Sequence, residues 1–232
     1  MKAPKPYLKA TAFVLISAFL LVFSSCTKED TSTDTDLGNA HLIVINSTKT
    51  TPAIDFYWTG NKLNVIPLAF GTTTGYQTVT SGTRNIQIKA NLTNTLLATN
   101  TIKVVRDSSY TFFVFDANGV ATTAIAEDDL SMPSFGNAKI KFANMSSGLS
   151  AADLAIINGP VIASSVSFGM IGNYTELKAG TYNLVLREHG TNKTMLNIPN
   201  VRVDNSKIYT IWSAGTVNGT GSLALSTQTF AR

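Results

Sequence analysis

Short runs of alternating apolar and polar residues recur from residue 39 to the end of the chain. A period of two is typical of strands with one buried face. Between the runs stand turn-forming groups such as Thr59-Gly60-Asn61 and Asp116-Ala117-Asn118-Gly119. No stretch after residue 38 has a sustained apolar repeat of 3.6 residues. The pattern therefore predicts an all-β protein.

The alternating pattern occurs twice. A shift of 98 positions aligns Asn46 with Asn144, Phe70-Gly71 with Phe168-Gly169, Tyr76 with Tyr174, and Gly82-Thr83 with Gly180-Thr181. A shift of 99 then aligns Tyr110-Thr111 with Tyr209-Thr210. We predict two homologous units, 39–130 and 136–232, joined through residues 131–134. With seven or eight short strands each, they are expected to be tandem immunoglobulin-like β-sandwich domains.

Each unit divides into short predicted strands. Those of the first unit are His41–Asn46, Ala53–Trp58, Leu63–Phe70, Tyr76–Thr80, Arg84–Ala90, Leu96–Val105, Tyr110–Asp116 and Val120–Ala126. Those of the second unit are Lys139–Asn144, Asp153–Ile157, Val161–Phe168, Tyr174–Leu177, Tyr182–Glu188, Met195–Val203, Tyr209–Ala214 and Ser222–Thr227.

The duplication tests which aromatic residues belong to the core. Asp55-Phe56-Tyr57-Trp58 aligns with Asp153-Leu154-Ala155-Ile156, so that Phe56 and Trp58 are replaced by aliphatic residues. Alternation places Phe56 and Trp58 on one face of the strand and Tyr57 on the other. We expect Trp58 to be a core residue rather than a sugar-stacking platform. Trp212, which aligns with Phe113, is expected in the core as well.

Both units keep the pattern F-G-x4-Y-x5-G-T, built on Phe70, Tyr76 and Gly82 in the first and on Phe168, Tyr174 and Gly180 in the second. Glycine permits the positive φ of a tight turn, and a tyrosine ring can close a sandwich edge. A structural role is the preferred interpretation. A ligand groove shared by both copies is the alternative.

The order Ala53-x-Asp55-x-Tyr57, Phe70-Gly71, Tyr76 and Gly82-Thr83 resembles the domain of unknown function 4397 family. That resemblance implies extracytoplasmic β-domains, often in tandem in bacterial lipoproteins and secreted proteins. The second copy departs from the pattern at Ala155, where the first has Tyr57. The family has no established activity, so the resemblance implies architecture and placement but no reaction.

The first 25 residues have the parts of a secretory signal peptide. Three lysines precede Thr11–Phe23, thirteen residues without a charge, and Ser24 and Ser25 follow. About 20 apolar residues are needed to cross a bilayer, so this stretch is short for a permanent anchor. We predict cleavage after residue 25, with an uncleaved N-terminal membrane helix as the alternative.

The only cysteine, Cys26, stands directly after this segment, and Phe23-Ser24-Ser25-Cys26 resembles a bacterial lipobox. A single cysteine cannot form an internal disulfide, and an unpaired thiol is a liability in an oxidising compartment. We therefore predict that Cys26 is acylated and that the protein meets the membrane through this N-terminal lipid.

Residues 26–38 contain few apolar side chains and are predicted to be a flexible tether. Within them, Lys28-Glu29-Asp30 resembles the surface-export signal of Bacteroidetes lipoproteins, a basic residue followed by two acids. The expected location is the outer membrane, lipid-anchored and exposed at the cell surface. A periplasm-facing position is the alternative.

The net charge gives little support for nucleic-acid binding. The whole chain has 18 basic and 14 acidic residues, but three lysines lie within residues 1–25. Removing them leaves 15 basic against 14 acidic residues, a net charge of +1. Nucleic-acid binding needs a concentrated basic surface, so we expect no nucleic-acid partner.

No catalytic site, metal site or cofactor is predicted. His41 and His189 lack the spacing of a metal site or a hydrolytic triad, and both are expected at solvated positions. Glu127-Asp128-Asp129 lacks calcium-loop spacing and is interpreted as a solvated run between the domains. Asp55 and Asp153, 98 residues apart, do not form a glycosidase pair.

We therefore expect a non-enzymatic, lipid-anchored envelope protein with a binding, adhesion or structural role. The alternative is a carbohydrate-binding accessory lipoprotein of a glycan-uptake system, with Tyr57, Tyr76 and Tyr174 as ligand contacts and a glycan or an envelope protein as partner. A hydrolase would need His189 to converge with acids. A fimbrial subunit would exchange strands between copies.

Overall fold

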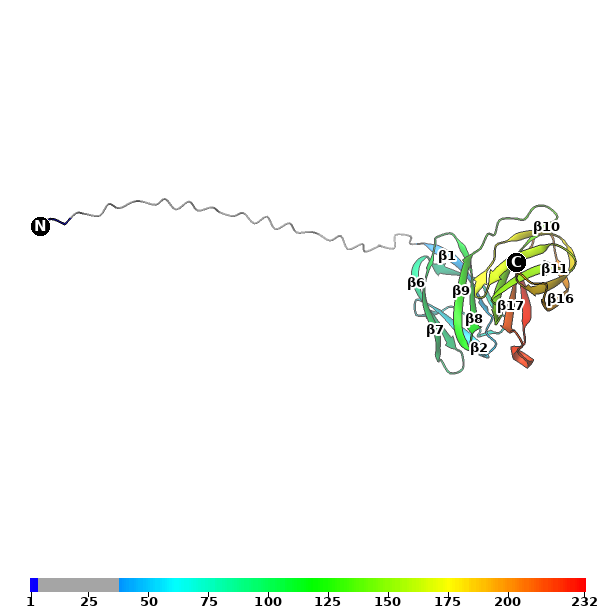
Figure 1. Ribbon diagram of the computed structural model, residues 1–232, viewed down its shortest axis with the longest axis horizontal. Coiled ribbons are helices and arrows are strands. Elements are labelled where there is room, and N and C mark those ends of the chain that lie inside the picture. The colour runs from blue at the N-terminus through cyan, green and yellow to red at the C-terminus, as the bar shows by residue number, and fades with distance from the viewer. Residues whose placement is uncertain (4–37) are drawn as a thin grey trace. The chain divides into compact units, whose positions relative to one another are not determined.

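The computed structural model of the protein describes residues 1–3 and 38–232 (Figure 1). By its contacts the chain forms two units, Met1–Thr33 and Asp34–Arg232, and every described strand belongs to the second. Cys26, Lys28, Glu29 and Asp30 lie outside the described residues, as do most of the predicted signal peptide and tether. Within the described part, no helix is long and apolar enough to cross a bilayer.

The described chain is all-β, as the alternating pattern predicts. The first sandwich pairs a sheet of order β5-β1-β8-β9 with a sheet of order β3-β2-β6-β7, in which β4 also pairs with β2. The strands are β1 (Asn39–Asn46), β2 (Ala53–Trp58), β3 (Asn61–Lys62), β4 (Leu68–Ala69), β5 (Thr73–Thr80), β6 (Gly82–Ala90), β7 (Leu96–Val104), β8 (Ser109–Ala117) and β9 (Val120–Glu127).

The second sandwich repeats this arrangement. One sheet has the order β13-β10-β17-β18, with β14 also on β10, and the other has the order β12-β11-β15-β16. The strands are β10 (Asn137–Ser147), β11 (Ala151–Ile156), β12 (Val161–Ser167), β13 (Met170–Ile171), β14 (Thr175–Lys178), β15 (Gly180–Glu188), β16 (Thr194–Val203), β17 (Ile208–Thr216) and β18 (Ser226–Ala231). In both copies the first strand pairs in parallel with a late one, β1 with β8 and β10 with β17.

Two of the predicted strands are wrong in extent. Leu63–Phe70 is not one strand, because the side chain of Asn64 makes hydrogen bonds to the backbone in place of strand pairing. Its Oδ1 accepts from the Phe56 amide at 2.7 Å, and its Nδ2 donates to the carbonyl of Ile66 at 2.9 Å. Near the C-terminus, a 3-10 turn, η1 (Gly221–Leu223), occupies the start of the predicted strand, and β18 begins only at Ser226. Gly221 opens that turn with φ +58°.

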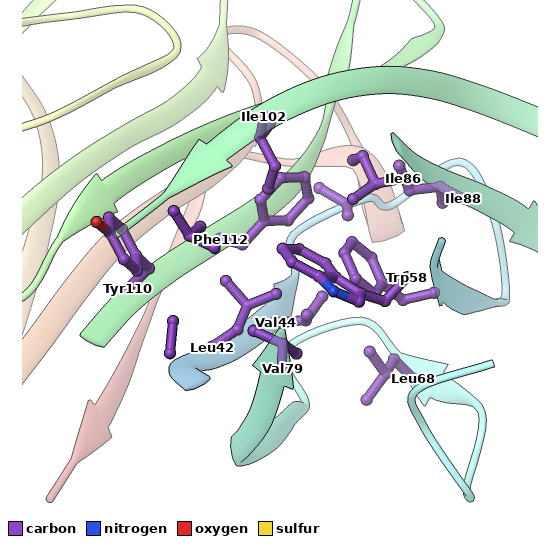
Figure 2. Close-up of a cluster of buried hydrophobic side chains, with 14 of the residues drawn as sticks. Leu42, Val44, Trp58, Leu68, Val79, Ile86, Ile88, Ile102, Tyr110 and Phe112 are labelled. Atoms are coloured by element: carbon purple, nitrogen blue, oxygen red, sulfur yellow. The ribbon is translucent and has the colours of Figure 1, made fainter. Parts of the chain in front are cut away.

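Each sandwich has its own hydrophobic core. In the first, Trp58 is 5% exposed and lies among aliphatic and aromatic side chains from both sheets, including Val44, Ile86 and Phe112 (Figure 2). Phe56 is fully buried and meets Phe112 edge-on, with ring centroids 5.1 Å apart. The prediction that Phe56 and Trp58 belong to the core is confirmed, and Tyr57 lies on the opposite face of β2.

A third hydrophobic cluster joins the two sandwiches, and we call it the junction. It consists of Ile45, Phe113, Phe115, Ala143, Met145, Trp212 and Ala214, which come from β1, β8, β10 and β17. Trp212 is buried as predicted, but in the junction rather than inside its own sandwich; its ring lies 5.7 Å from that of Phe113. The four strands are therefore buried on both faces, and in β1 and β8 this turns alternation into nearly continuous apolar runs.

Candidate functional site

The residues that both copies retain build the scaffold around the junction. Gly71 and Gly169 adopt φ of +78° and +76°, and their amides donate to the carbonyls of Asn46 and Asn144 at 2.8 Å. Both asparagines are fully buried and bind the carbonyls of equivalent residues, Leu68 and Val166. Phe70 and Phe168, which precede the glycines, pack against the junction. These contacts support the structural interpretation of the repeated pattern.

A polar cluster centred on Asp128 lies beside the apolar junction, and we call it the Asp128 cluster. Its members are Asp128, Lys141, Arg232, Tyr76, Tyr174 and Thr111. Tyr76 donates its hydroxyl to Asp128 Oδ2 at 2.5 Å, and Tyr174 donates to Oδ1 at 3.1 Å. Thr111 Oγ1 lies 2.8 Å from Oδ2. The equivalent tyrosines of the two copies therefore converge on one carboxylate from the segment that connects the sandwiches.

Two cations neutralise this carboxylate. Lys141 Nζ forms an ion pair with Asp128 Oδ1, and Arg232 Nη2 lies 3.2 Å from the same oxygen. The Asp128 side chain is fully buried, that of Lys141 is 1% exposed and that of Arg232 is 12% exposed. Arg232 Nη2 also donates to the Tyr174 hydroxyl at 2.5 Å. Ammonium and guanidinium groups at this depth need a counter-ion, because an unpaired buried charge is very costly.

The ionisation of the cluster follows from burial and pairing. Burial alone would raise the pKa of Asp128, but Lys141 and Arg232 outweigh it and hold that pKa below its ordinary value. Burial lowers the pKa of Lys141, with Asp128 opposing the shift. Burial, with the adjacent Asp128 carboxylate, raises the pKa of both Tyr76 and Tyr174. The tyrosines therefore stay protonated as donors to a carboxylate that stays ionised.

The Asp128 cluster corrects the interpretation of Glu127-Asp128-Asp129 as a solvated run. Glu127, the last residue of β9, is exposed, whereas Asp129 pairs with Lys139 Nζ at 2.6 Å and Asp128 is buried. Among the described residues, no three acidic, histidine or cysteine side chains gather as metal ligands. Asp128 has hydrogen-bond donors on every side, so its role here is to hold the sandwiches together.

Of the three tyrosines predicted as ligand contacts, the structure brings two together. Tyr76 and Tyr174 meet at Asp128, where their hydroxyls are engaged. Tyr57 lies apart from them on the outer face of the sheet β3-β2-β6-β7, and Lys89 Nζ sits 4.5 Å from its ring centroid. The three rings do not form one row, so a glycan site on this chain would be built around Tyr57 alone.

Asp55 and Asp153 occupy equivalent places as anchors for neighbouring loops. Asp55 accepts from Lys62, Asn64 and Asn91 at 2.8–3.0 Å. Asp153 accepts from the Ser165 amide at 2.7 Å and lies 2.9 Å from His189 Nδ1. Both carboxyl groups have a pKa below the ordinary value, because these hydrogen bonds outweigh the cost of partial burial.

His189 thus has a partner that the spacing of the sequence did not indicate. It is still solvated, with a side chain 42% exposed, and His41 is exposed on β1. The nearby Ser164 hydroxyl donates to Asp153 at 3.2 Å rather than to His189. In a hydrolytic triad the imidazole must bond the nucleophile as well as the acid. In this trio Asp153, rather than His189, is the central residue that contacts the other two. The three side chains therefore lack the hydrogen bonding of a hydrolytic triad.

Around Tyr57, an uncovered sheet face carries a row of polar side chains. Cross-strand pairing places Lys62 of β3 opposite Tyr57 of β2, Tyr57 opposite Gln87 of β6, and Gln87 opposite Thr99 of β7. Further along the same face lie Asn85, Thr101 and Lys103. We call these residues, with Lys89, the Tyr57 face. In Figure 1, β6 and β7 lie on the side of the first sandwich away from β11 and β16.

Sequence reasoning missed Lys141, Arg232 and Lys89. A signal existed for the first, because the duplication aligns Lys141 with Ile43, and a lysine in place of a buried isoleucine requires a counter-ion. Arg232 has no such signal, since it lies 104 residues from Asp128 along the chain. Lys89 joins Tyr57 only through the pairing of β2 with β6.

Comparison with known proteins gives a family. Residues 40–155 match the family described as Domain of unknown function (DUF4397). No curated protein matches the chain in sequence.

Solved structures give only remote likenesses. The C-terminal domain of AlgF from P. aeruginosa is 18% identical, covering 42% of this chain and 99% of its own, with a TM-score of 0.33. A family CBM26 module of Eubacterium rectale Amy13K, in complex with maltoheptaose, is 12% identical over 83% of this chain and 96% of its own, with a TM-score of 0.28. A protein named for cell adhesion from Parabacteroides distasonis is 7% identical over 84% and 99%, with a TM-score of 0.22.

Proposed function

The chain belongs to the family called Domain of unknown function (DUF4397), and from this premise we propose that it is a lipid-anchored, non-catalytic binding protein of the bacterial envelope. The observation that carries the proposal is the position of its one cysteine. Cys26 follows a basic segment, thirteen uncharged residues and two serines, which is the order of a lipoprotein signal. In this proposal residues 1–25 are removed and Cys26 becomes the acylated first residue.

Acylation of Cys26 would supply membrane affinity. Each buried methylene contributes about 0.8 kcal/mol, and stable anchoring takes more than one acyl chain. A diacylglycerol on the Cys26 sulfur, with a further chain on the amino group, meets that requirement. The tether would then separate the two sandwiches from the bilayer.

The non-catalytic part of the proposal rests on how the polar residues are engaged. The carboxylate of Asp128 is surrounded by donors, and Asp55 and Asp153 each hold three groups of neighbouring loops or strands. A general base must reach a substrate proton directly or through one water molecule. A carboxylate whose oxygens are already bound to fixed protein donors is a structural group, so the surface of the sandwiches is left to act by binding.

Replacing Cys26 with alanine tests the anchor. In bacteria that process lipoproteins, the wild-type chain should sediment with membranes and have an intact mass that corresponds to residues 26–232 plus acyl chains. Cys26→Ala should leave the membrane fraction or retain its leader. Thr27→Ala is the matched control and should behave like wild type. Unchanged membrane retention of a Cys26→Ala chain whose leader has been removed, or an unmodified wild-type mass, would refute the lipid anchor.

A second experiment tests surface exposure. Lys28, Glu29 and Asp30 are changed together to alanine, and protease is added to intact cells. If the triplet directs export, the wild-type chain is digested and the variant is protected while still bound to membranes. Changing Asp34 and Asp36 to alanine removes tether acids outside the triplet and should leave digestion unchanged. Protection of the wild type would favour the periplasm-facing position.

A further inference from the structure

The Tyr57 face has a larger excess of positive charge than its counterpart in the second copy. Three basic residues, Lys62, Lys89 and Lys103, and a single acid, Asp55, lie on this face. The matching face of the second copy has Arg187, Arg202 and Asp153, and Arg202 there is paired with Asp204. The one acid near the Tyr57 face is 9% exposed and already paired with Lys62. The charge exposed to solvent is therefore that of ammonium groups.

The row of side chains across this face is also specific to the first copy. The first copy reads Lys62, Tyr57, Gln87, Thr99 across four strands. The equivalent row in the second copy reads Val161, Ala155, Val185, Asn197. One row presents an ammonium group, an aromatic ring, an amide and a hydroxyl, and the other is mainly aliphatic. The two copies share the scaffold and differ in what this face can bind.

The chemistry of the row matches a sugar chain that carries acids. Strands lie about 4.8 Å apart, so four of them span about 14 Å, enough for a few sugar rings. An aromatic ring contacts the apolar face of a sugar, and amides and hydroxyls hydrogen-bond its hydroxyl groups. Lys89 Nζ lies over the Tyr57 ring, 4.5 Å from its centroid, and Lys103 lies further along the same face, whereas Lys62 is already paired with Asp55. Lys89 and Lys103 could each pair with a carboxylate of a neighbouring sugar.

Charge complementarity favours this occupant over others. A neutral glycan would leave the lysines unused, and nucleic acid is bound by denser positive charge with several stacking rings. From these observations we propose that the Tyr57 face binds an acidic polysaccharide, with Tyr57 in contact with a sugar ring and Lys89 and Lys103 in contact with its carboxylates. This inference rests on the proposed binding role outside the cytoplasm.

The test compares two forms of one polymer. The full-length protein, purified in a neutral detergent from whichever cell fraction contains it, is titrated with polygalacturonate and with its fully methyl-esterified form, in which the backbone is kept and the charge removed. Binding should be restricted to the acidic form and should weaken as NaCl rises from about 50 mM to about 500 mM, since salt screens exposed charges. Equal binding of both forms, or no binding of either, would overturn the proposal.

Equivalent positions in the second copy supply the controls. Lys89→Gln should weaken binding by about two- to fivefold, as expected for an exposed ion pair. Tyr57→Ala, which introduces the residue of the second copy, should weaken it by about three- to tenfold. Arg187→Gln, the counterpart of Lys89→Gln, should leave binding unchanged. Coincident unfolding curves for the four proteins establish that these differences arise at the surface.

Two further outcomes would identify a different partner. Single-stranded DNA or anionic phospholipid vesicles that bind more tightly than polygalacturonate, with the same dependence on Tyr57 and Lys89, would replace the glycan with nucleic acid or a membrane surface. Loss of binding in Arg187→Gln to the same extent as in Lys89→Gln would move the site to the second sandwich. Failure here is separate from failure of the lipid anchor, because this assay measures a purified chain and the anchor is measured by fractionation and mass.

Discussion

At the junction, the two sandwiches present the same tyrosine but different residues on the neighbouring strand. Tyr76 and Tyr174 are equivalent, and both reach Asp128. Beside Tyr76 stands Ile43, fully buried and apolar, whereas the corresponding position of the second copy is Lys141, equally buried and charged. A duplicated surface that packs against its own copy would be symmetric. Lys141 breaks that symmetry, and Asp128, which lies between the copies, compensates for its charge.

The outer faces of the two sandwiches also differ, but there the first copy has the polar and charged residues. There the first copy carries the polar and charged row around Tyr57, and the second carries Ala155 and Val185 at the matching positions. Buried charge appears at the junction only where a counter-charge exists, while charge on the outer face is solvated and needs none. The same duplication has thus allowed one difference that serves assembly and another that is available for binding.

Among substitutions at the junction, replacing Asp128 should lower the free energy of unfolding the most. Asp128→Asn keeps the shape of the side chain but leaves Lys141 and Arg232 buried without a counter-ion. Loss of one partner from a buried pair typically costs about 3–5 kcal/mol of unfolding free energy. Urea unfolding followed by tryptophan fluorescence measures it. Glu127→Gln, which changes the exposed neighbour that precedes Asp128, should leave the curve nearly unchanged.

A second substitution distinguishes a lost counter-ion from a general loss of packing. Lys141→Ile installs the residue of the first copy, so Asp128→Asn combined with Lys141→Ile removes both charges of the pair. Such double replacements are often neutral or stabilising relative to the pair. The double variant should recover most of the stability lost by Asp128→Asn. Strictly additive losses would show that Lys141 and Asp128 are not energetically coupled.

Acid should open the junction through the same carboxylate. Because the folded-state pKa of Asp128 lies below its ordinary value near 4, its stabilising contribution is complete above about pH 4 and is lost as the pH falls through the folded pKa. Of the groups that face it, Lys141 and the two tyrosines stay protonated throughout that range. Protonation therefore leaves the two cations unbalanced.

Tryptophan fluorescence can locate this acid transition. A Trp58→Phe background leaves Trp212, at the junction, as the only tryptophan. Its emission should change below pH 4, and the change should be absent or already complete in a variant that also carries Asp128→Asn. Acid titration curves that coincide with and without Asp128 would contradict the assignment.

Removing the hydroxyl of Tyr76 or Tyr174 should lower the free energy of unfolding by less than Asp128→Asn does. The two losses should also differ from each other. A hydrogen bond to a charged group contributes about 1.5–3 kcal/mol, so Tyr76→Phe and Tyr174→Phe should each destabilise the fold by that order. Tyr174→Phe should cost more, because its hydroxyl also accepts from Arg232 at 2.5 Å. Tyr182→Phe removes an exposed bond to the Lys178 carbonyl and serves as the control. Equal unfolding midpoints for all three variants would contradict this ranking.

Much of the fold can be predicted from the sequence, because alternation depends only on neighbouring residues and the 98-residue shift appears when the chain is aligned with itself. The junction is different, since it depends on how two sandwiches pack. It still leaves a signal in β1, where Leu42 to Ile45 are all apolar and all buried. Such a run within an alternating protein indicates a strand covered on both sides. The sequence does not say what covers it.

The partners of single polar residues are harder to predict. Asp128 looks like part of a solvated acidic run because its neighbours Glu127 and Asp129 are also acidic. Its burial depends on Lys141 and Arg232, which reach it only after the second sandwich has folded. Likewise, His189 meets Asp153 because β11 pairs with β15, a contact between residues 36 positions apart. Long-range pairing of this kind has no local signature.

The smallest effect is expected at His189, where the copies offer a direct exchange. His189→Asn installs the residue of the first copy, Asn91, whose amide donates to Asp55 at 3.0 Å. The new amide can donate to Asp153 in the same way, and the site is exposed, so stability should change by less than about 0.5 kcal/mol. Asp153→Ala should cost more, because the Ser165 amide and the Ser164 hydroxyl also lose their acceptor. Comparable losses in thermal unfolding for the two variants would mean that a charged His189–Asp153 pair, rather than the carboxylate alone, anchors this loop, and the equivalence with Asn91 and Asp55 would then fail.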